Sequence, residues 1–276
     1  MKLQLRNRTL DLTQAAVMGV LNVTPDSFSD GGQLLSAGAA LERARAMAEE
    51  GAAILDIGGE STRPGAAPVS VQEELDRVIP VVEKIAAQID CAVSVDTRKP
   101  AVMRAAVSAG AHMVNDVEAL RAPDALEAVS AAGAAVCLMH MQGEPRTMQQ
   151  APHYRDVVGE VAAFLTARRA ACLDAGIAAD RIVLDPGIGF GKTLEHNLQL
   201  LAHIGELGAP LLVGVSRKSM FRDLLNLPVE ARLHAGLAAA AVAVWQGAAI
   251  VRAHDVAPTV QAVRVAAALR QHKALP

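Results

Sequence analysis

Short apolar segments that stop abruptly at a polar residue recur eight times along the chain, and this repetition limits the fold more than any other feature. The first segment runs from Ala16 to Leu21 and stops at Asn22, where a turn-rich stretch begins. Short, apolar, β-branched runs are typical of parallel strands that are buried on both faces. The other segments end at Asp56, Asp96, Asn115, His140, Asp185, Ser216 and Arg252.

Helical patterns alternate with these strands. The expected strands lie at 16–21, 53–57, 92–95, 112–114, 134–139, 182–184, 211–215 and 249–251. The expected helices lie at 36–50, 71–88, 100–109, 123–132, 154–175, 194–203, 229–246 and 256–271. Eight strand and helix pairs predict an α/β fold, a single-domain (β/α)8 TIM barrel over residues 1–276. An open, doubly wound sheet is the alternative, but the glycine-rich dinucleotide fingerprint that normally follows its first strand does not occur there.

The residues before the first strand predict a β-hairpin. Leu3 and Leu5 face Leu10 and Leu12 across a polar Arg-Asn-Arg turn. We expect this N-terminal hairpin to lie at the floor of the barrel.

Composition argues against several classes of function. The net charge is -3, basic residues are scattered and aromatic residues make up only 2% of the chain, so no nucleic-acid partner is expected. No apolar stretch reaches the roughly 18 residues of a membrane span, and the N-terminus lacks a signal-peptide core. We therefore expect a cytoplasmic protein without a membrane partner. The three cysteines have no metal-ligand spacing, which predicts buried, inert thiols.

In such a barrel the carboxyl ends of all strands open onto one face, so the polar strand ends should converge on one pocket. Asp96, Asn115 and Asp185 offer acceptors for the amino and ring N–H groups of a flat heterocycle such as a pterin. Each of them alone could instead cap a helix. The loops at 24–33 and 58–69 are long and rich in Gly, Pro and Ser, which favours mobile lids over this pocket.

The glycine-rich run from Asp185 to Thr193 places Phe190 as an aromatic surface near the same pocket. It is not a Walker A phosphate loop, because position 186 is proline where that motif requires glycine. The glycines could let the backbone approach a flat ligand, or they could simply form a tight strand-to-helix turn.

Cationic residues follow the last strands and favour an anion site. They are Arg217, Lys218, Arg252 and His254, with Arg63 in the second loop. Arginine can bind phosphate oxygens bidentately, and a helix that begins near Ser219 would direct free N–H groups at an anion. A solvated rim of ordinary basic residues is the alternative, but it would not place the charges directly after strands.

These motifs resemble the dihydropteroate synthase family over nearly the whole chain and in the family's order. The two most specific stretches are MGVLNVTPDSFSDGG at 18–32 and DIGGESTRPG at 56–65. Further matches lie at 94–97, 115–116, 138–141, 185–192, 216–219 and 252–256. Members of this family are TIM-barrel transferases of folate biosynthesis. They join 6-hydroxymethyl-7,8-dihydropterin pyrophosphate to p-aminobenzoate, release pyrophosphate and 7,8-dihydropteroate, and are targets of sulfonamides.

The resemblance implies a role for each matched residue. Asp96, Asn115, Asp185 and Lys218 would hold the pterin, and Asn22 would contact Mg²⁺. Pyrophosphate would bind to Thr62, Arg63, Arg252 and His254, with Arg217 nearby, and p-aminobenzoate to Phe28, Pro64, Phe190 and Ser219. Asp96, Lys218, Arg252 and His254 form the expected catalytic set. The family also implies a homodimer and a dissociative, SN1-like displacement.

Two other functions would also account for a pterin-binding barrel. A methyltetrahydrofolate corrinoid methyltransferase is similar in its barrel and pterin-binding acids, but it needs neither the long first loop nor the Arg-x-His anion site. A catalytically silent pterin-binding paralogue should lack Asn22, Arg63, Lys218 or His254, and all four are present. Departures from the family pattern are Ala253, the pair Ala235-Gly236 near a helix start, and Glu118, whose negative charge near the pocket has no evident role.

Overall fold

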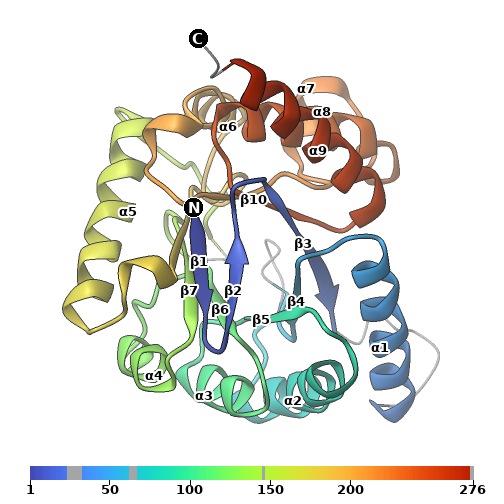
Figure 1. Ribbon diagram of the computed structural model, residues 1–276. Helices are drawn as coiled ribbons and strands as arrows, with labels where there is room; N and C mark the ends of the chain where they lie inside the picture. Colours follow the sequence, from blue (N-terminus) through green and yellow to red (C-terminus); the bar gives the residue numbers. More distant parts are fainter. Residues whose placement is uncertain (24–32, 62–66, 145–146, 274–276) are drawn as a thin grey trace.

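The computed structural model describes residues 1–23, 33–61, 67–144 and 147–273 and forms a barrel of strands surrounded by helices (Figure 1). The barrel strands are β3 (Ala16–Asn22), β4 (Ile54–Gly58), β5 (Ala92–Asp96), β6 (Met113–Asp116), β7 (Ala135–Met139), β8 (Ile182–Asp185), β9 (Leu212–Gly214) and β10 (Ile250–Ala253). The helices are α1 (Gln33–Glu49), α2 (Val71–Gln88), α3 (Pro100–Ser108), α4 (Ala125–Ala132), α5 (Val157–Asp174), α6 (Leu194–Ala202), α7 (Met220–Leu225), α8 (Leu233–Gln246) and α9 (Val256–Lys273).

The strands form one parallel sheet in the order β8-β7-β6-β5-β4-β3-β10-β9. An isolated parallel bridge between Leu184 and Leu211 joins its two edges, and the Leu184 N–H donates to the Pro210 carbonyl at 2.9 Å. The sheet therefore closes into the predicted TIM barrel, and the open-sheet alternative is wrong.

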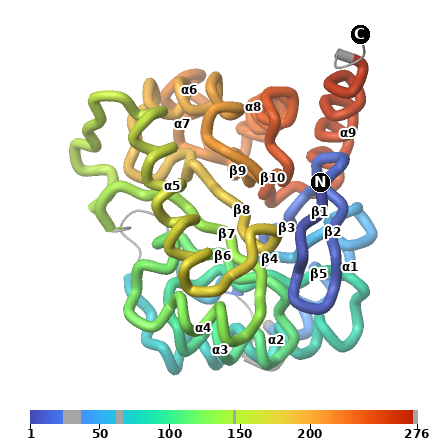
Figure 2. The backbone as a smooth tube through the Cα atoms, turned by 60° about the vertical axis from the view of Figure 1, so that its left-hand side comes forward, coloured from blue at the N-terminus to red at the C-terminus, as the bar shows by residue number. Residues whose placement is uncertain are grey.

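The helices pack against the strands through apolar residues at helical spacing. In α2 the buried positions include Val78, Val81, Val82 and Ile85, and the Ser70 side chain caps the helix by accepting from the Glu73 N–H at 3.1 Å. Consecutive helices α2, α3 and α4 lie side by side along one side of the barrel (Figure 2). The expected helix at 229–246 begins later, at Leu233, because a short 3-10 turn precedes it.

The predicted hairpin is present and lies at the floor of the barrel. Strands β1 (Lys2–Leu5) and β2 (Arg8–Asp11) pair antiparallel and cross the end of the barrel in Figure 1. Leu3 lies opposite Leu10 as expected, but Leu5 lies opposite Arg8 and not Leu12, because the turn is shorter than the Arg-Asn-Arg stretch. Leu3 and Leu5 are buried against residues from the interior of the barrel, including Met18, Ile54 and Val183. Burial of these apolar side chains stabilises the hairpin on the floor of the barrel.

All three cysteines are free and buried, as expected. No helix in the described part of the chain is long and apolar enough to cross a membrane. The expected cytoplasmic location stays a prediction.

Candidate active site

Three strands bring a partly buried arginine and two aspartates together at the carboxyl ends of the barrel strands. Arg252 of β10 donates from Nε to Asp56 Oδ2 of β4 at 2.6 Å, and from Nη2 to Asp96 Oδ2 of β5 at 2.7 Å. Asn115 of β6 donates from Nδ2 to Asp56 Oδ2 at 3.0 Å. Parallel register explains this convergence, because Asp96 lies between Gly58 and Asn115 on the neighbouring strands. We call Asp56, Asp96, Asn115 and Arg252 the acid–arginine cluster.

Five polar residues that the sequence places after the strands belong to the strands themselves. Asn22, Asp96 and Asp185 each end a strand, and Asn115 and Arg252 lie within their strands. A polar side chain can complete a strand when it points into the open end of the barrel, where it meets partners from other strands.

Burial sets the protonation of the acids. It raises the pKa of Asp96 to about 7, although the Arg252 charge beside it favours the ionised form. Burial also raises the pKa of Asp185, while the Gly187 N–H donates to Asp185 Oδ1 at 2.7 Å and acts in the opposite direction. The Asp96 carboxyl can therefore exchange a proton near neutrality when a ligand changes its surroundings.

Lys218 and Phe190 form the wall beside this cluster. The Lys218 Nζ lies 4.1 Å from the centroid of the Phe190 ring, a cation–π contact. A Cβ at Gly189, where φ is +82°, would lie 3.1 Å from Lys218 Cδ, so a side chain there would displace the lysine. Burial lowers the pKa of Lys218 to about 8, and Asp185 limits this shift.

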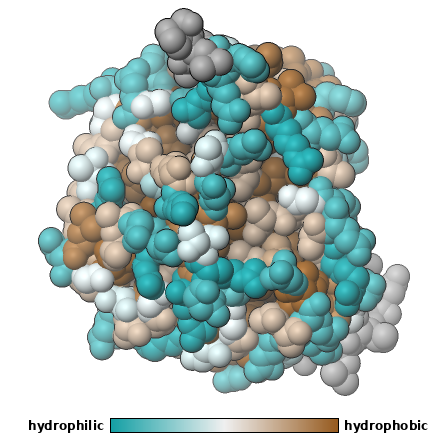
Figure 3. Space-filling view, viewed as in Figure 1, coloured by the Kyte–Doolittle hydropathy of each residue, from teal (hydrophilic) through white to brown (hydrophobic). Residues whose placement is uncertain are grey.

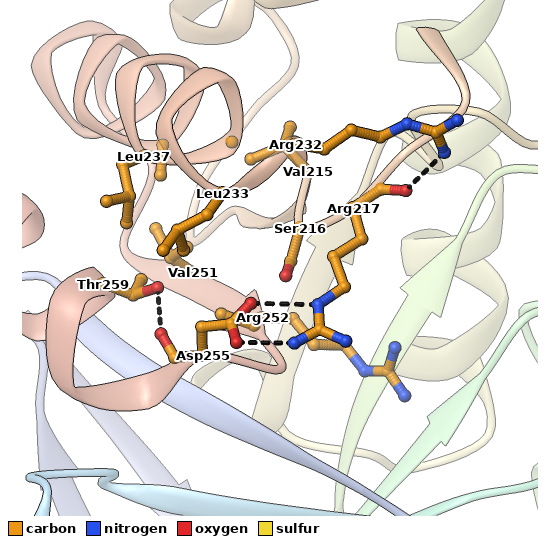
Figure 4. Close-up of a pocket in the computed structure, with 13 residues that line it drawn as sticks. Val215, Ser216, Arg217, Arg232, Leu233, Leu237, Val251, Arg252, Asp255 and Thr259 are labelled. Atoms are coloured by element: carbon orange, nitrogen blue, oxygen red, sulfur yellow. Dashed lines mark hydrogen bonds and ion pairs between the residues drawn. The ribbon is translucent and has the colours of Figure 1, made fainter. Parts of the chain in front are cut away.

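Arg217 lies at the rim with its charge already paired. It donates from Nε and Nη2 to the two Asp255 carboxylate oxygens at 3.0 and 2.6 Å, and Figure 4 shows the two side chains facing each other. The Arg232 side chain donates to the Arg217 carbonyl at 3.2 Å. Arg217 is therefore held to Asp255 in this structure, and its expected place near the pyrophosphate stays a prediction.

His254 is not a cation at neutral pH, contrary to the sequence-based expectation. Burial, together with the positive charges of Arg252 and Arg217, lowers the pKa of His254 to about 4. The Ser216 Oγ lies 3.2 Å from the His254 backbone nitrogen and 3.1 Å from its Nδ1. Because the hydroxyl accepts from the backbone N–H, it can donate to Nδ1, and the ring then carries its proton on Nε2.

Ser219 precedes α7, as expected. It is exposed, and its side chain makes no capping hydrogen bond with the helix. The hydroxyl is thus available at the mouth of the barrel.

Asn22 faces the acid–arginine cluster across Gly58. A Cβ placed on Gly58 would lie 3.7 Å from Asn22 Oδ1 and 3.8 Å from Asp96 Oδ2, so the two oxygens flank the same small space. No group of three or more His, Cys, Asp or Glu side chains able to hold a metal occurs in the described part of the chain. The oxygen of Asn22 suits a Mg²⁺ that takes most of its ligands from water and phosphate.

The remaining predicted contacts fall outside the described residues. They are Phe28, Thr62, Arg63 and Pro64, and most of the two expected lid loops lies with them, at 24–32 and 62–66.

Asp56 and Lys192 are residues to which sequence reasoning assigned no role. Asp56 stands at the end of an apolar run in the sequence, but β4 continues to Gly58, which leaves Asp56 inside the barrel as the acceptor for Arg252 and Asn115. Lys192 is buried and its Nζ contacts His140 Nδ1 at 2.9 Å. Glu118, which lacked an explanation, pairs with Arg98 at 3.0 Å.

Comparisons with known proteins agree with this geometry. A family model described as pterin binding enzyme matches residues 18–254. The dihydropteroate synthase of Escherichia coli (strain K12) is 54% identical over 268 residues, which cover 96% of this chain and 95% of that relative.

Two solved structures share the whole fold. The dihydropteroate synthase of Yersinia pestis in complex with a sulfonamide drug gives a TM-score of 0.93 at 52% identity, covering 98% of this chain and 100% of that one. The dihydropteroate synthase of Xanthomonas albilineans with 4-aminobenzoic acid gives a TM-score of 0.91 at 50% identity, covering 100% of this chain and 99% of that one. The likeness extends over both the barrel and the strand ends that form the site.

Proposed function

Because the chain belongs to the pterin-binding enzyme family and, within it, to the dihydropteroate synthases, we propose that the acid–arginine cluster binds the pterin substrate and helps to expel its diphosphate. The reaction is a transfer of the pterin methylene group from diphosphate to the amine of p-aminobenzoate, which yields 7,8-dihydropteroate. The observation that carries the assignment of roles is the convergence of Asp56, Asp96 and Arg252 at one end of the barrel.

Asp96, Asn115 and Asp185 would accept hydrogen bonds from the amino and ring N–H groups of the pterin. Asp96 currently accepts from Arg252 Nη2, so a pterin donor at Asp96 would compete with that contact. Once displaced from Asp96, the Nη2 of Arg252 would be free to donate to the diphosphate, while Asp56 keeps Nε in place. Pterin binding and diphosphate binding would thus share one arginine.

The chemistry follows from the weak nucleophilicity of an aromatic amine conjugated to a carboxylated ring. The bond between the methylene carbon and the diphosphate oxygen breaks first, and its electron pair leaves with the oxygen. The amine nitrogen then attacks the carbon and loses a proton. Positioned donors that stabilise the leaving charge can each lower a barrier by about 2.7–4 kcal/mol, as for an oxyanion hole.

Three side chains would meet the leaving diphosphate. Arg252 offers the remaining donors of its guanidinium, Arg63 would approach from the second loop, and neutral His254 would donate through Nε2–H. A neutral donor suits this task because it holds the anion without binding it so tightly that release is slow.

Mg²⁺ is part of the proposal, with Asn22 Oδ1 as its protein ligand. When bound, the ion would supply positive charge to the diphosphate oxygens. Acidic side chains already neutralise part of the positive charge at the mouth, because Arg217 is paired with Asp255 and Arg252 with two aspartates. A bound Mg²⁺ would add positive charge for the diphosphate.

Phe190 and Ser219 would contact p-aminobenzoate, the first through its ring and the second through its hydroxyl at the start of α7. The same surface would receive a sulfonamide, which competes for the space. Phe28 and Pro64 would complete this site from the two early loops.

We also propose a homodimer that uses helices α8 and α9. Val242, Trp245, Val265 and Leu269 are between 38% and 62% exposed. They line a surface cleft of about 560 Å³ with other apolar residues of both helices. Hydrophobic side chains come to the surface at the upper right of Figure 3, over this part of the molecule. A contiguous apolar face of this kind is typical of a subunit interface.

The test of function is release of pyrophosphate when the pterin substrate and p-aminobenzoate are mixed with the protein and Mg²⁺. We expect release that requires p-aminobenzoate. Absence of release would support the catalytically silent paralogue, and methyl transfer from methyltetrahydrofolate to a corrinoid protein would support the methyltransferase.

A further inference from the structure

The glycine-rich loop after β8 is held from beneath by the nitrogen of a buried lysine. Lys192 is only 3% exposed, and its Nζ lies 2.9 Å from the Phe190 carbonyl oxygen and 2.9 Å from His140 Nδ1. The His140 carbonyl lies 3.4 Å from the same nitrogen. These three acceptors match the three donors of an ammonium group, so Lys192 ties the loop after β8 to the residue after β7.

Three acceptors around Nζ favour the protonated form of Lys192, whereas burial lowers its pKa to about 7, a shift that the Asp185 charge limits. Burial, with the charge of Lys192 second, lowers the pKa of His140 to about 3, so the imidazole is neutral. Its Nδ1 can then accept from the lysine. The His140 ring also packs edge-on against Phe164, at 4.9 Å between centroids, which fixes its orientation.

The two loops approach so closely that only glycine fits between them. A Cβ at Gly187 would lie 1.9 Å from the His140 carbonyl oxygen, and one at Gly191 would lie 2.6 Å from the Gln142 carbonyl oxygen. The Tyr154 hydroxyl donates to the Gly191 carbonyl at 2.9 Å. The backbone that carries Phe190 is therefore fixed on both sides, and Lys192 donates a hydrogen bond to its carbonyl oxygen.

Phe190 connects this loop to the candidate active site through its contact with Lys218. Its ring lies under the Lys218 ammonium at 4.1 Å, and Gly189 leaves room for the Lys218 stem. A shift of the Phe190 backbone would therefore move the aromatic wall proposed for p-aminobenzoate and the ammonium proposed for the pterin.

We propose that Lys192 is a positioning residue, which sets Phe190 through its carbonyl and, through the Phe190 ring, the ammonium of Lys218. This inference rests on the proposed function for its kinetic consequence, but not for its structural one. Lys192 touches neither substrate in this scheme, and its effect on both passes through Phe190.

The kinetic test is a double-mutant cycle of Lys192→Met and Phe190→Ala. In the wild-type background we expect Lys192→Met to lower kcat/KM for p-aminobenzoate by roughly tenfold, a coupling of ordinary size for residues in contact. In the Phe190→Ala background Lys192→Met should lower kcat/KM for p-aminobenzoate by less than about twofold, because the ring that Lys192 positions is gone. Lys2→Met, an exposed lysine on the hairpin at the floor, is the matched control and should change nothing. Equal losses in both backgrounds would overturn the proposal.

A second measurement does not depend on activity. Amine-reactive labelling followed by peptide mass spectrometry reports how accessible the Lys218 ammonium is, and Lys192→Met should speed labelling of Lys218 by at least about threefold. Lys192→Leu, which also removes the donor to the Phe190 carbonyl, covers the case in which the methionine variant fails to fold, and it should shift labelling in the same direction. Unchanged labelling of Lys218 in a folded variant would overturn the inference, whereas absence of pyrophosphate release by the wild-type protein would overturn only the proposed function.

Discussion

At the residue scale, Arg252 is the group on which the buried acids of the site depend. Its Nε and Nη2 are taken by Asp56 and Asp96, and burial of carboxylates is costly unless such partners are present. Asp56 Oδ1 is buried and has no hydrogen-bond partner among the described residues. Asp56 therefore acts mainly through Oδ2, on which both Arg252 and Asn115 converge.

Asp56→Asn should lower catalytic efficiency because an amide oxygen holds Arg252 less firmly than a carboxylate. The expected loss in kcat/KM is roughly 10- to 100-fold, since a hydrogen bond to a charged group contributes about 1.5–3 kcal/mol. Asp90→Asn is the control, because the Asp90 side chain is 95% exposed. Steady-state kinetics with both substrates check this, and wild-type efficiency in Asp56→Asn would contradict the assigned role.

Pterin binding should release protons near pH 7. Burial raises the pKa of Asp96 to about 7, so the free carboxyl is partly protonated at that pH, and N–H donors of the ligand would favour its ionised form. We expect release on the order of half a proton at pH 7. Calorimetry in two buffers of different ionisation enthalpy measures the number of protons released, and Asp96→Asn should reduce that number. Equal enthalpies in both buffers with the wild-type protein would contradict this linkage.

At the element scale, a partly buried ion network joins α2, the start of α3 and both ends of the loop after β4. Lys99 Nζ lies 3.0 Å from Glu60 Oε2, 2.5 Å from Glu74 Oε2 and 2.6 Å from the Val69 carbonyl oxygen. The Val69 N–H donates to Glu60 Oε1 at 3.2 Å. Glu60 precedes the loop and Val69 follows it, so one ammonium group holds the two ends of the loop together.

Lys99→Met should destabilise the fold because it leaves the Glu74 carboxyl, whose side chain has no exposed area, without its cation. Loss of one partner from a buried pair costs about 3–5 kcal/mol. The double variant Lys99→Met with Glu74→Leu should recover most of this loss, since no isolated charge remains. Urea unfolding provides the free energies. A double variant as unstable as the single one would show that the network stabilises the fold by other means than pairing.

At the scale of the whole molecule, the two ends of the barrel have different tasks. The floor is apolar, with Leu3 and Leu5 of the hairpin packed on the interior of the strands. The mouth holds the acid–arginine cluster and Lys218. This division lets the strands be stabilised at one end while polar side chains at the other remain available to ligands.

The proposed dimer should depend on the apolar face of α8 and α9. Val265 is 62% exposed there, and Val265→Glu should convert the dimer to a monomer by placing a charge in an apolar interface. Val71→Glu is the matched control, because Val71 is 42% exposed at the start of α2, away from this face. Sedimentation velocity measures the mass. A dimeric Val265→Glu variant would place the interface elsewhere.

Much of the fold could be predicted because its signals are local. Strand and helix patterns alternate with short connections, and right-handed crossovers leave few arrangements for eight such units. Strand ends were the weaker part: Asn22, Asp96 and Asp185 look like loop residues in the sequence, although each one pairs within the sheet. Only the inward direction of these side chains makes a polar residue compatible with a strand.

Charge states and partners could not be predicted in the same way. Arg217 and His254 look like free cations in the sequence, but Asp255 pairs with the first, and burial beside Arg252 keeps the second neutral. In the sequence Lys192 looks like part of a glycine-rich turn, and only the structure shows its contact with His140, 52 positions earlier.

The order of residues by itself determined that the chain forms a barrel and that acids and cations gather at its mouth, because hydrophobic period and strand direction are properties of neighbouring residues. The tertiary structure alone decided which charges pair, which histidine stays neutral and which lysine is buried. Those outcomes depend on distances between distant segments and on exclusion of water, and neither is encoded in any single stretch of the chain.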